Sequence, residues 1–142
     1  DDSHTGAFGV IAIVLLLFFK IHAIESVEIE RWRALLAAPV LGRWAMVLFG
    51  HHSQAAKPGL GSNLVDHLKT KHLVFASFIT LIIVVAILRE VGVALMIWIA
   101  AFSLASKAFF HRRLGGVTGD TFGAVGELSE AFVFVILALG PR

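Results

Sequence analysis

The sequence contains no cysteine, so neither disulfide bonds nor thiolate metal sites can form. Charged residues are also scarce: they make up 15% of the 142 residues, against 58% hydrophobic residues and a mean hydropathy of +0.86. A soluble domain needs a larger polar surface, so this balance indicates an integral membrane protein. The basic residues are spread over several loops and do not gather with aromatic residues in one patch, which argues against nucleic-acid binding.

Five apolar segments follow one another along the chain, and no internal repeat is found. They cover residues 6–24, 34–50, 73–88, 91–106 and about 120–140. Several are shorter than the roughly 20 residues of a spanning helix, so we expect tilt or flanking turns. Only Arg89 and Glu90 separate the third and fourth segments, which predicts a tight helical hairpin. We therefore predict an all-α, polytopic membrane helical bundle of about five spans, forming a single domain over residues 1–142.

Two of the segments contain residues that are unusual in a membrane. Lys20 lies close enough to the end of the first segment to snorkel towards the bilayer surface. Pro39 and Arg43 interrupt the second segment, which is therefore either kinked and packed inside the bundle or only partly inserted.

Basic residues favour one side of the predicted bundle. Five spans place the amino terminus and the loops 51–72 and 107–119 on the same side. Because basic loops commonly remain in the cytoplasm, we predict that this side is cytoplasmic. It would carry Lys57, Lys69, Lys71, Lys107, Arg112 and Arg113, and the other side Arg31, Arg33, Arg89 and Arg142.

Three acidic residues lie at the start of the last apolar segment and inside it. Asp120, Gly123, Glu127 and Glu130 stand at i, i+3, i+7 and i+10, which is one face of an α-helix. An ionised carboxylate at membrane depth costs at least a few kcal/mol unless a cation, a hydrogen bond or water compensates. We refer to these residues as the acidic stripe and expect a compensating group beside them.

Three blocks of the sequence resemble a known family. They are DDSHTGAFGVIAIVLLLFFK at residues 1–20, APVLGRWAMVLFGHHSQAAKPGLGSNL at 38–64 and RRLGGVTGDTFGAVGELSE at 112–130. In this order they are similar to cobalamin synthase, the adenosylcobinamide-GDP ribazoletransferase family. The resemblance implies a multi-pass enzyme of the bacterial cytoplasmic (inner) membrane that acts late in adenosylcobalamin biosynthesis. It would join α-ribazole or its 5′-phosphate to adenosylcobinamide-GDP and release GMP, with Mg²⁺ as cofactor and its active face in the cytoplasm. Whether the protein is a homo-oligomer stays open.

The resemblance also suggests which residues form the site. Carboxylates holding Mg²⁺ neutralise the oxygens of a pyrophosphate and stabilise the leaving GMP, and Arg side chains bind phosphate through two oxygens. Glycines before a helix N-terminus let backbone N–H groups approach an anion. The predicted catalytic residues are Asp120, Glu127 and Glu130; the predicted metal ligands are these three and Asp2; the predicted phosphate-binding residues are Lys57, Arg112, Arg113, Gly115, Gly116 and Gly119.

The chain also departs from the family pattern. Family members carry a further acid-rich section upstream of the first block, so we expect this chain to be the carboxy-terminal portion and to be inactive alone. Within the blocks, His4 stands where Arg is expected, and His51, His52 and Gln54 replace an aromatic residue and an Arg.

Two other functional classes remain open from the residues alone. A small transporter or channel subunit would also use intramembrane acids, to conduct protons or cations. Such a pore has no use for the GGVTGD motif or for the Arg112 and Arg113 pair. A non-catalytic assembly partner would retain the fold without the missing motif.

Several motifs also have a purely structural interpretation. Gly115, Gly119 and Gly123 have the spacing of close helix packing in lipid. Arg112 and Arg113 would ordinarily be a topological anchor. Pro58, Gly59 and Gly61 suggest a turn. The histidines His51, His52, His67 and His72 lack the helical i, i+4 spacing of a zinc site, which favours solvated loop residues.

Overall fold

The computed structural model describes residues 3–27 and 31–139, and within these ranges the regular structure is helical. Five helices are long and apolar enough to cross a membrane, as predicted. A short sixth helix lies in a loop. The helices are α1 (Ser3–Ser26), α2 (Arg31–Gly50), α3 (Leu60–His67), α4 (Thr70–Leu88), α5 (Glu90–Leu114) and α6 (Gly119–Ala138).

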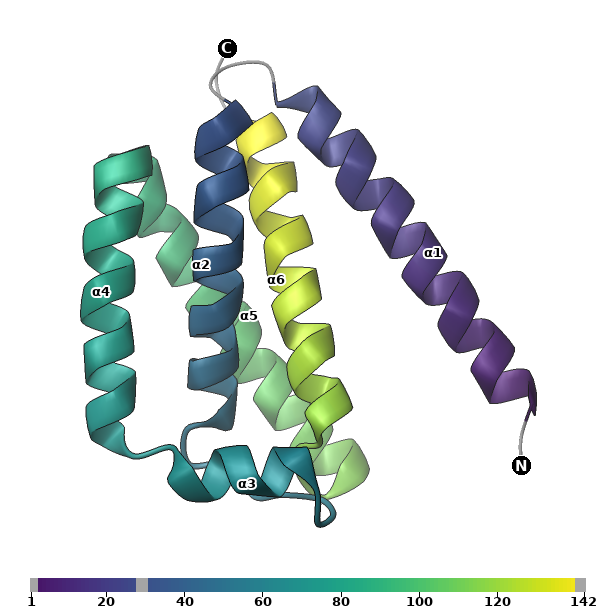
Figure 1. The fold of residues 1–142 in the computed structure, drawn as a ribbon. Helices are drawn as coiled ribbons and strands as arrows, with labels where there is room; N and C mark the ends of the chain where they lie inside the picture. The colour runs from purple at the N-terminus through teal and green to yellow at the C-terminus, as the bar shows by residue number, and fades with distance from the viewer. Residues whose placement is uncertain (1–2, 28–30, 140–142) are drawn as a thin grey trace.

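Helices α4, α5 and α6 surround α2, and α1 lies on the outer side of α6 (Figure 1). α2 packs most extensively against α6 and also contacts α4 and α5, whereas α1 contacts mainly α6. α1 leans away from α6 towards its N-terminal end, and α3 lies across the end of the bundle where α2 ends and α6 begins (Figure 1). The loops 51–59 and 115–118 therefore share one end, as expected for two loops that are separated by two spans.

Small residues allow α2 to occupy the centre. Ala37, Ala38 and Ala45 are fully buried, and a Cβ atom at Gly42 would lie 3.1 Å from the carbonyl oxygen of Gly126 on α6. Half of the α2 span is buried inside the chain, the largest share of the five. Of the two predicted alternatives for this segment, packing inside the bundle is therefore correct, with Pro39 inside a continuous helix.

The hairpin between α4 and α5 is confirmed, but the end of α5 was predicted too early. Arg89 turns the chain with a φ of 54°, and Gly92 lets α5 approach the backbone of Val84. α5 continues past residue 106 to Leu114, so it is about 37 Å long. The helix continues because residues 107–114 contain no Gly or Pro, and Gly115, which adopts a φ of 73°, ends it.

α3 was not predicted. Its eight residues bury Gly61 against the bundle, where a Cβ atom would lie 2.8 Å from the nitrogen of Gly119. The Ser62 hydroxyl accepts a hydrogen bond from the Gly59 N–H at 3.0 Å and caps the helix. The predicted turn is therefore right for Pro58 and Gly59 and wrong for Gly61.

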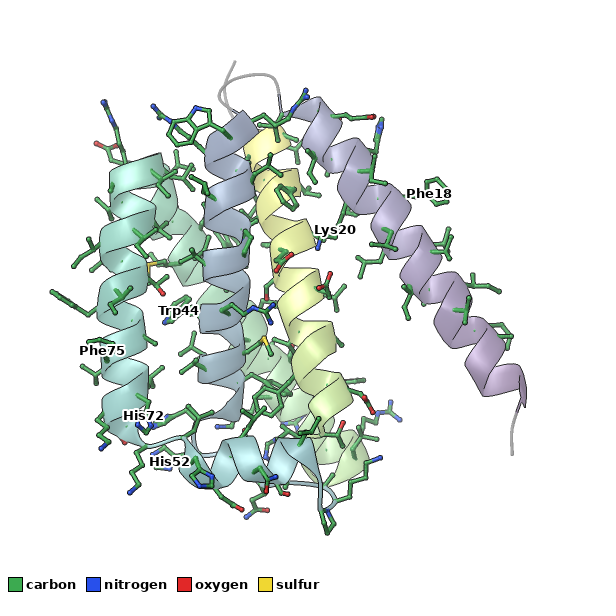
Figure 2. All side chains as sticks on the ribbon, in the orientation of Figure 1. Phe18, Lys20, Trp44, His52, His72 and Phe75 are labelled. Atoms are coloured by element: carbon green, nitrogen blue, oxygen red, sulfur yellow. The ribbon has the colours of Figure 1, made fainter. Side chains whose placement is uncertain are left out.

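Aromatic and hydroxyl side chains complete the core. The Phe49 ring meets the Phe122 ring edge to face at 5.2 Å between centroids. Trp44, labelled in Figure 2, donates its indole N–H to the Ser77 hydroxyl at 2.9 Å. The Ser103 hydroxyl donates to the Ala45 carbonyl at 2.7 Å, so helix contacts in the core also carry hydrogen bonds.

Candidate functional site

Two loops that are about 60 residues apart in sequence are joined at the end of the bundle. The Val117 N–H donates to the Gln54 carbonyl at 2.8 Å, and the Ala56 N–H donates to the Val117 carbonyl at 3.0 Å. These bonds form a short parallel bridge between Ala55 and Val117. Together they fix the position of the Gly-rich loop that precedes α6. We call this contact the loop junction.

Side chains from α5 hold the first loop in place. The His111 Nε2 atom accepts a hydrogen bond from the Gln54 N–H at 3.1 Å, and its Nδ1 atom lies 2.8 Å from the Lys107 carbonyl. The Lys107 ammonium donates to the His51 carbonyl at the end of α2. His51 and Gln54, which depart from the family pattern, therefore take part in the hydrogen bonds that hold this loop.

Asp120 lies in the first turn of α6, directly after the loop junction. Thr118 caps this helix: its Oγ1 accepts from the Thr121 N–H at 3.3 Å, while the Thr121 hydroxyl accepts from the Thr118 N–H at 2.8 Å. The Asp120 side chain is exposed and makes no ion pair within the described residues. A carboxylate there is favoured by the positive end of the helix dipole and is accessible to a ligand.

The predicted cationic residues lie near the same end of the bundle. Lys57 lies in the first loop, Arg112 and Arg113 lie in the last turn of α5, and all three are exposed. The Arg113 guanidinium lies 6.0 Å from the Phe109 ring centroid. The structure thus gathers these three cations and Asp120 at one end, but it shows no contact between any of the cations and Asp120.

Glu127 and Glu130 lie in the middle of α6 and pair with Lys20 of α1. The Lys20 ammonium is 2.8 Å from a carboxylate oxygen of each, and 13% of the Lys20 side chain is exposed. Figure 2 shows Lys20 pointing towards α6. The expectation that Lys20 snorkels is therefore wrong, because two carboxylates at membrane depth attract its ammonium more strongly than the bilayer surface does.

Comparison with known proteins decides the family. Residues 1–138 match the family described as cobalamin-5-phosphate synthase. The chain belongs to this family. It is 34% identical, over 99% of its length, to an adenosylcobinamide-GDP ribazoletransferase of Geotalea daltonii. Proteins of the same name are 35% identical over 93% of the chain in Syntrophobacter fumaroxidans and 39% identical over 97% in Pseudomonas fluorescens. The chain spans 58%, 54% and 58% of these three relatives. No solved structure matches the chain.

In this member of the cobalamin-5-phosphate synthase family, the acidic stripe divides into two parts. Asp120 and Glu130 are ten residues apart on one helix, which separates them by about 15 Å along its axis. Among the described residues, no group of three or more His, Asp or Glu side chains lies close enough to hold one metal ion. One ion shared by Asp120, Glu127 and Glu130 therefore does not fit this geometry.

The individual residues differ in how well they suit Mg²⁺. Asp120 offers the hard oxygen donor that Mg²⁺ requires, and no cation pairs with it among the described residues. Glu127 and Glu130 share the single positive charge of Lys20, so a metal ion would have to compete with its ammonium. Asp2 lies outside the described residues. A metal role for each of these residues stays a prediction.

The glycines of the loop before α6 have different environments. Gly116 is buried, and a Cβ atom there would lie 2.4 Å from the Gln54 carbonyl oxygen, so this residue permits the loop junction. The Gly115 N–H already donates to the His111 carbonyl at 3.1 Å. Gly119 is half-buried beside Leu60. Gly115 and Gly123 have no described atom within 4 Å of a Cβ position, so neither allows close packing against another described helix of this chain.

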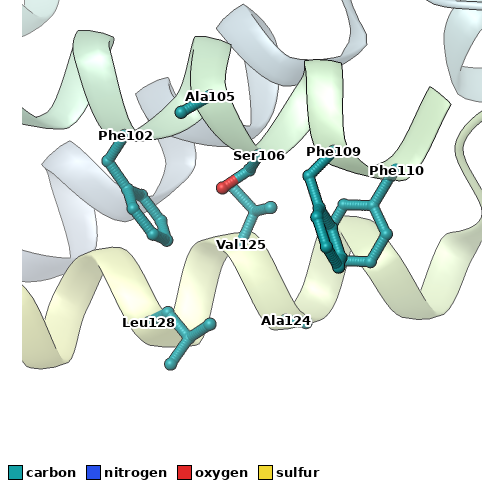
Figure 3. A pocket seen from close by; sticks show the side chains of 8 residues that line it. All are labelled: Phe102, Ala105, Ser106, Phe109, Phe110, Ala124, Val125 and Leu128. Atoms are coloured by element: carbon teal, nitrogen blue, oxygen red, sulfur yellow. The ribbon is translucent and has the colours of Figure 1, made fainter. Parts of the chain in front are cut away.

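An apolar groove of about 340 Å³ lies between α5 and α6 (Figure 3). Its one polar side chain is Ser106, so it offers no charged group to a phosphate. It is lined by Phe102, Ala105, Ser106, Phe109, Phe110, Ala124, Val125 and Leu128.

His51 directly follows α2, and its surroundings shift the pKa of its imidazole. Partial burial lowers the pKa of its imidazole below the ordinary value, and the nearby His52 and Lys107 lower it further. Its Nε2 atom lies 3.2 Å from the Thr70 hydroxyl at the start of α4. The neutral form of His51 therefore suits the folded loop.

Acidification is expected to loosen the loop 51–59. His51 in an unfolded chain takes up a proton near pH 6.5, whereas the lowered pKa delays protonation in the folded chain. Its stabilising contribution is thus complete above about pH 6.5 and is lost as the pH falls through the folded-state pKa. Hydrogen exchange of this loop, corrected for the intrinsic effect of pH, should increase on acidification. The increase should be smaller in His51→Gln, and an equal increase there would rule out His51 as its origin.

Proposed function

We propose that this chain forms the membrane bundle and part of the active site of an adenosylcobinamide-GDP ribazoletransferase. The observation that carries the proposal is the match of residues 1–138 to the cobalamin-5-phosphate synthase family, together with its named relatives. The substrates would be adenosylcobinamide-GDP and α-ribazole or its 5′-phosphate. The enzyme would lie in the bacterial inner membrane, with the loop junction on the cytoplasmic side.

The reaction requires a hydroxyl of the ribazole to attack the phosphorus on the cobinamide side of the pyrophosphate. A new oxygen–phosphorus bond forms, the bond to the bridging oxygen breaks, the hydroxyl proton leaves, and GMP departs with the electron pair. Such a transfer depends on aligning the reactants and neutralising the phosphate oxygens. A bound Mg²⁺ would supply part of that neutralisation.

Residues at the end of the bundle suit these tasks. Arg112, Arg113 and Lys57 are exposed cations that can bind the pyrophosphate, and Arg can contact two of its oxygens at once. Asp120 is our proposed Mg²⁺ ligand, because its carboxylate is exposed and has no cation bound within the described residues. The loop junction would hold the loop with Lys57 beside the start of α6, where Asp120 lies.

Replacing Asp120 by Asn tests the proposal, because the amide keeps the volume of the side chain and loses its charge. In membranes with this chain, or with this chain joined to the additional section of a relative, adenosylcobalamin formation and GMP release should fall roughly 100-fold. The dependence on Mg²⁺ concentration should shift as well.

Glu130→Gln is the matched control. It removes a charge from the same helix, but from a carboxylate that pairs with Lys20, so the Mg²⁺ dependence should stay unchanged if Asp120 holds the ion without Glu130, and a shifted dependence would add Glu130 to the metal site. An Asp120→Asn protein with an unaltered rate would remove Asp120 from the site. Absence of transfer in both wild-type preparations would refute the proposed function.

A further inference from the structure

Arg43 is a cation in the membrane-spanning part of the bundle that has no carboxylate partner among the described residues. It lies seven residues before the end of α2, about 10 Å inside the helix, and its side chain is exposed. Its guanidinium donates to the Met46 sulfur at 3.5 Å, and thioether sulfur is a weak acceptor. Across the described ranges, the ion pairs are those of Lys20, and none includes Arg43.

Arg43 belongs to the face on which α2 and α6 also meet α1. The preceding residue, Gly42, touches Glu130, where a Cβ atom would lie 2.8 Å from the Glu130 Cγ atom. Met46, the contact of Arg43, lies 3.0 Å from a Cβ position at Gly126. Arg43 is therefore on the same side of the helix pair as Glu127, whose side chain is 52% exposed.

Little of this chain covers that face. Leu36 and Pro39, at i−7 and i−4 from Arg43, are exposed and share its stripe on α2. On α6, Gly123 has no described atom within 4 Å of a Cβ position. The neighbouring α1 leans away in Figure 1, and only 6% of its span is buried inside the chain.

Lipid is a poor cover for such a face. Hydrocarbon offers no acceptor to a guanidinium, and charged side chains at this depth normally face other protein or a water-filled cavity. The relatives are longer than this chain, which spans little more than half of them. They therefore have additional polypeptide that can supply a cover.

We propose that the stripe Leu36, Pro39 and Arg43, with the adjoining Glu127 side of α6, is an interaction surface for a further membrane-spanning helix. That helix presents a carboxylate to Arg43 and a hydrogen-bond donor to Glu127. It belongs to the section by which the relatives exceed this chain. Gly123 leaves room for its close approach. This inference concerns assembly and does not depend on which reaction the protein catalyses.

A spin-label experiment tests this surface, and the absence of native cysteine makes the labelling selective. Nitroxides are attached at Leu36→Cys on the stripe and, as a control, at Val74→Cys on α4, where the native side chain is 62% exposed. Each is compared in this chain alone and in a fusion with the additional section of the Geotalea daltonii relative, with that section's cysteines replaced. Collision with dissolved oxygen reports how well each site is covered.

The Leu36 nitroxide should lose several-fold oxygen accessibility in the fusion, whereas the Val74 nitroxide should not. Arg43→Glu should restore accessibility at Leu36, and a Lys in place of the partner carboxylate should restore the cover in that variant. Equal accessibility in chain and fusion would overturn the proposal. Protection that appears in the chain alone and disappears on dilution in lipid would assign the surface to a second copy instead. Protection unaffected by Arg43→Glu would refute charge recognition.

Discussion

Replacing Lys20 by Met is expected to release α1 from α6. The Lys20 ammonium is 2.8 Å from both Glu127 and Glu130, and only 6% of the α1 span is buried inside the chain. Its loss leaves two carboxylates on adjacent turns without a cation, and Glu130, the less exposed of the two at 16%, becomes an uncompensated charge against α1. The distance between nitroxides at Phe8→Cys on α1 and Leu128→Cys on α6, both exposed positions, should become longer and broader.

Removing the carboxylates together with the cation is the control for this prediction. In the triple variant with Glu127→Gln and Glu130→Gln, the amides need no counter-ion, so the distance distribution should return towards that of the native chain. Lys20→Arg should retain the native distribution, since its guanidinium can bind both carboxylates. An unchanged distribution in Lys20→Met would mean that apolar packing alone holds α1.

Substituting Gly116 by Val is expected to separate the two loops at the end of the bundle. Even a Cβ atom would lie 2.4 Å from the Gln54 carbonyl oxygen and 2.7 Å from the Ala56 nitrogen, and these backbone atoms cannot rotate away. The hydrogen bonds of Val117 to both residues would be lost. Overpacking and lost hydrogen bonds together should destabilise the fold by about 2–3 kcal/mol. Hydrogen exchange at the Val117 and Ala56 amides should accelerate strongly.

Gly123→Ala provides the comparison within α6. A Cβ atom at this position has no described atom within 4 Å, and alanine loses less conformational freedom in a helix than glycine does. Its stability should be unchanged or higher by about 0.5–1 kcal/mol, as measured by thermal unfolding in detergent. If the Val117 amide exchanged equally slowly in Gly116→Val, the loop junction would not depend on this glycine.

Apolar segment length predicted the spans, because a helix that crosses lipid must be long and hydrophobic. The hairpin at Arg89 and Glu90 could also be predicted from the sequence, since two residues allow no other connection between the helices. α3 and the extension of α5 to Leu114 could not be predicted, because both lie in polar sequence where helix formation depends on capping and packing. The candidate cations and Asp120 could be assigned to one end by counting spans.

The sequence alone therefore determined the helical membrane fold, the shared end of the loops and the resemblance to one family, all of which depend on composition, spacing or residue identity. Only the tertiary structure decided which groups meet. Glu127 and Glu130 share a helix face with Asp120, yet the partner they contact is Lys20, more than 100 residues earlier. Gly116 allows two loops to come into close backbone contact, because a side chain there would collide with the loop 51–59. Such pairings depend on how the helices pack, and the residue spacing within one helix carries no information about its neighbours.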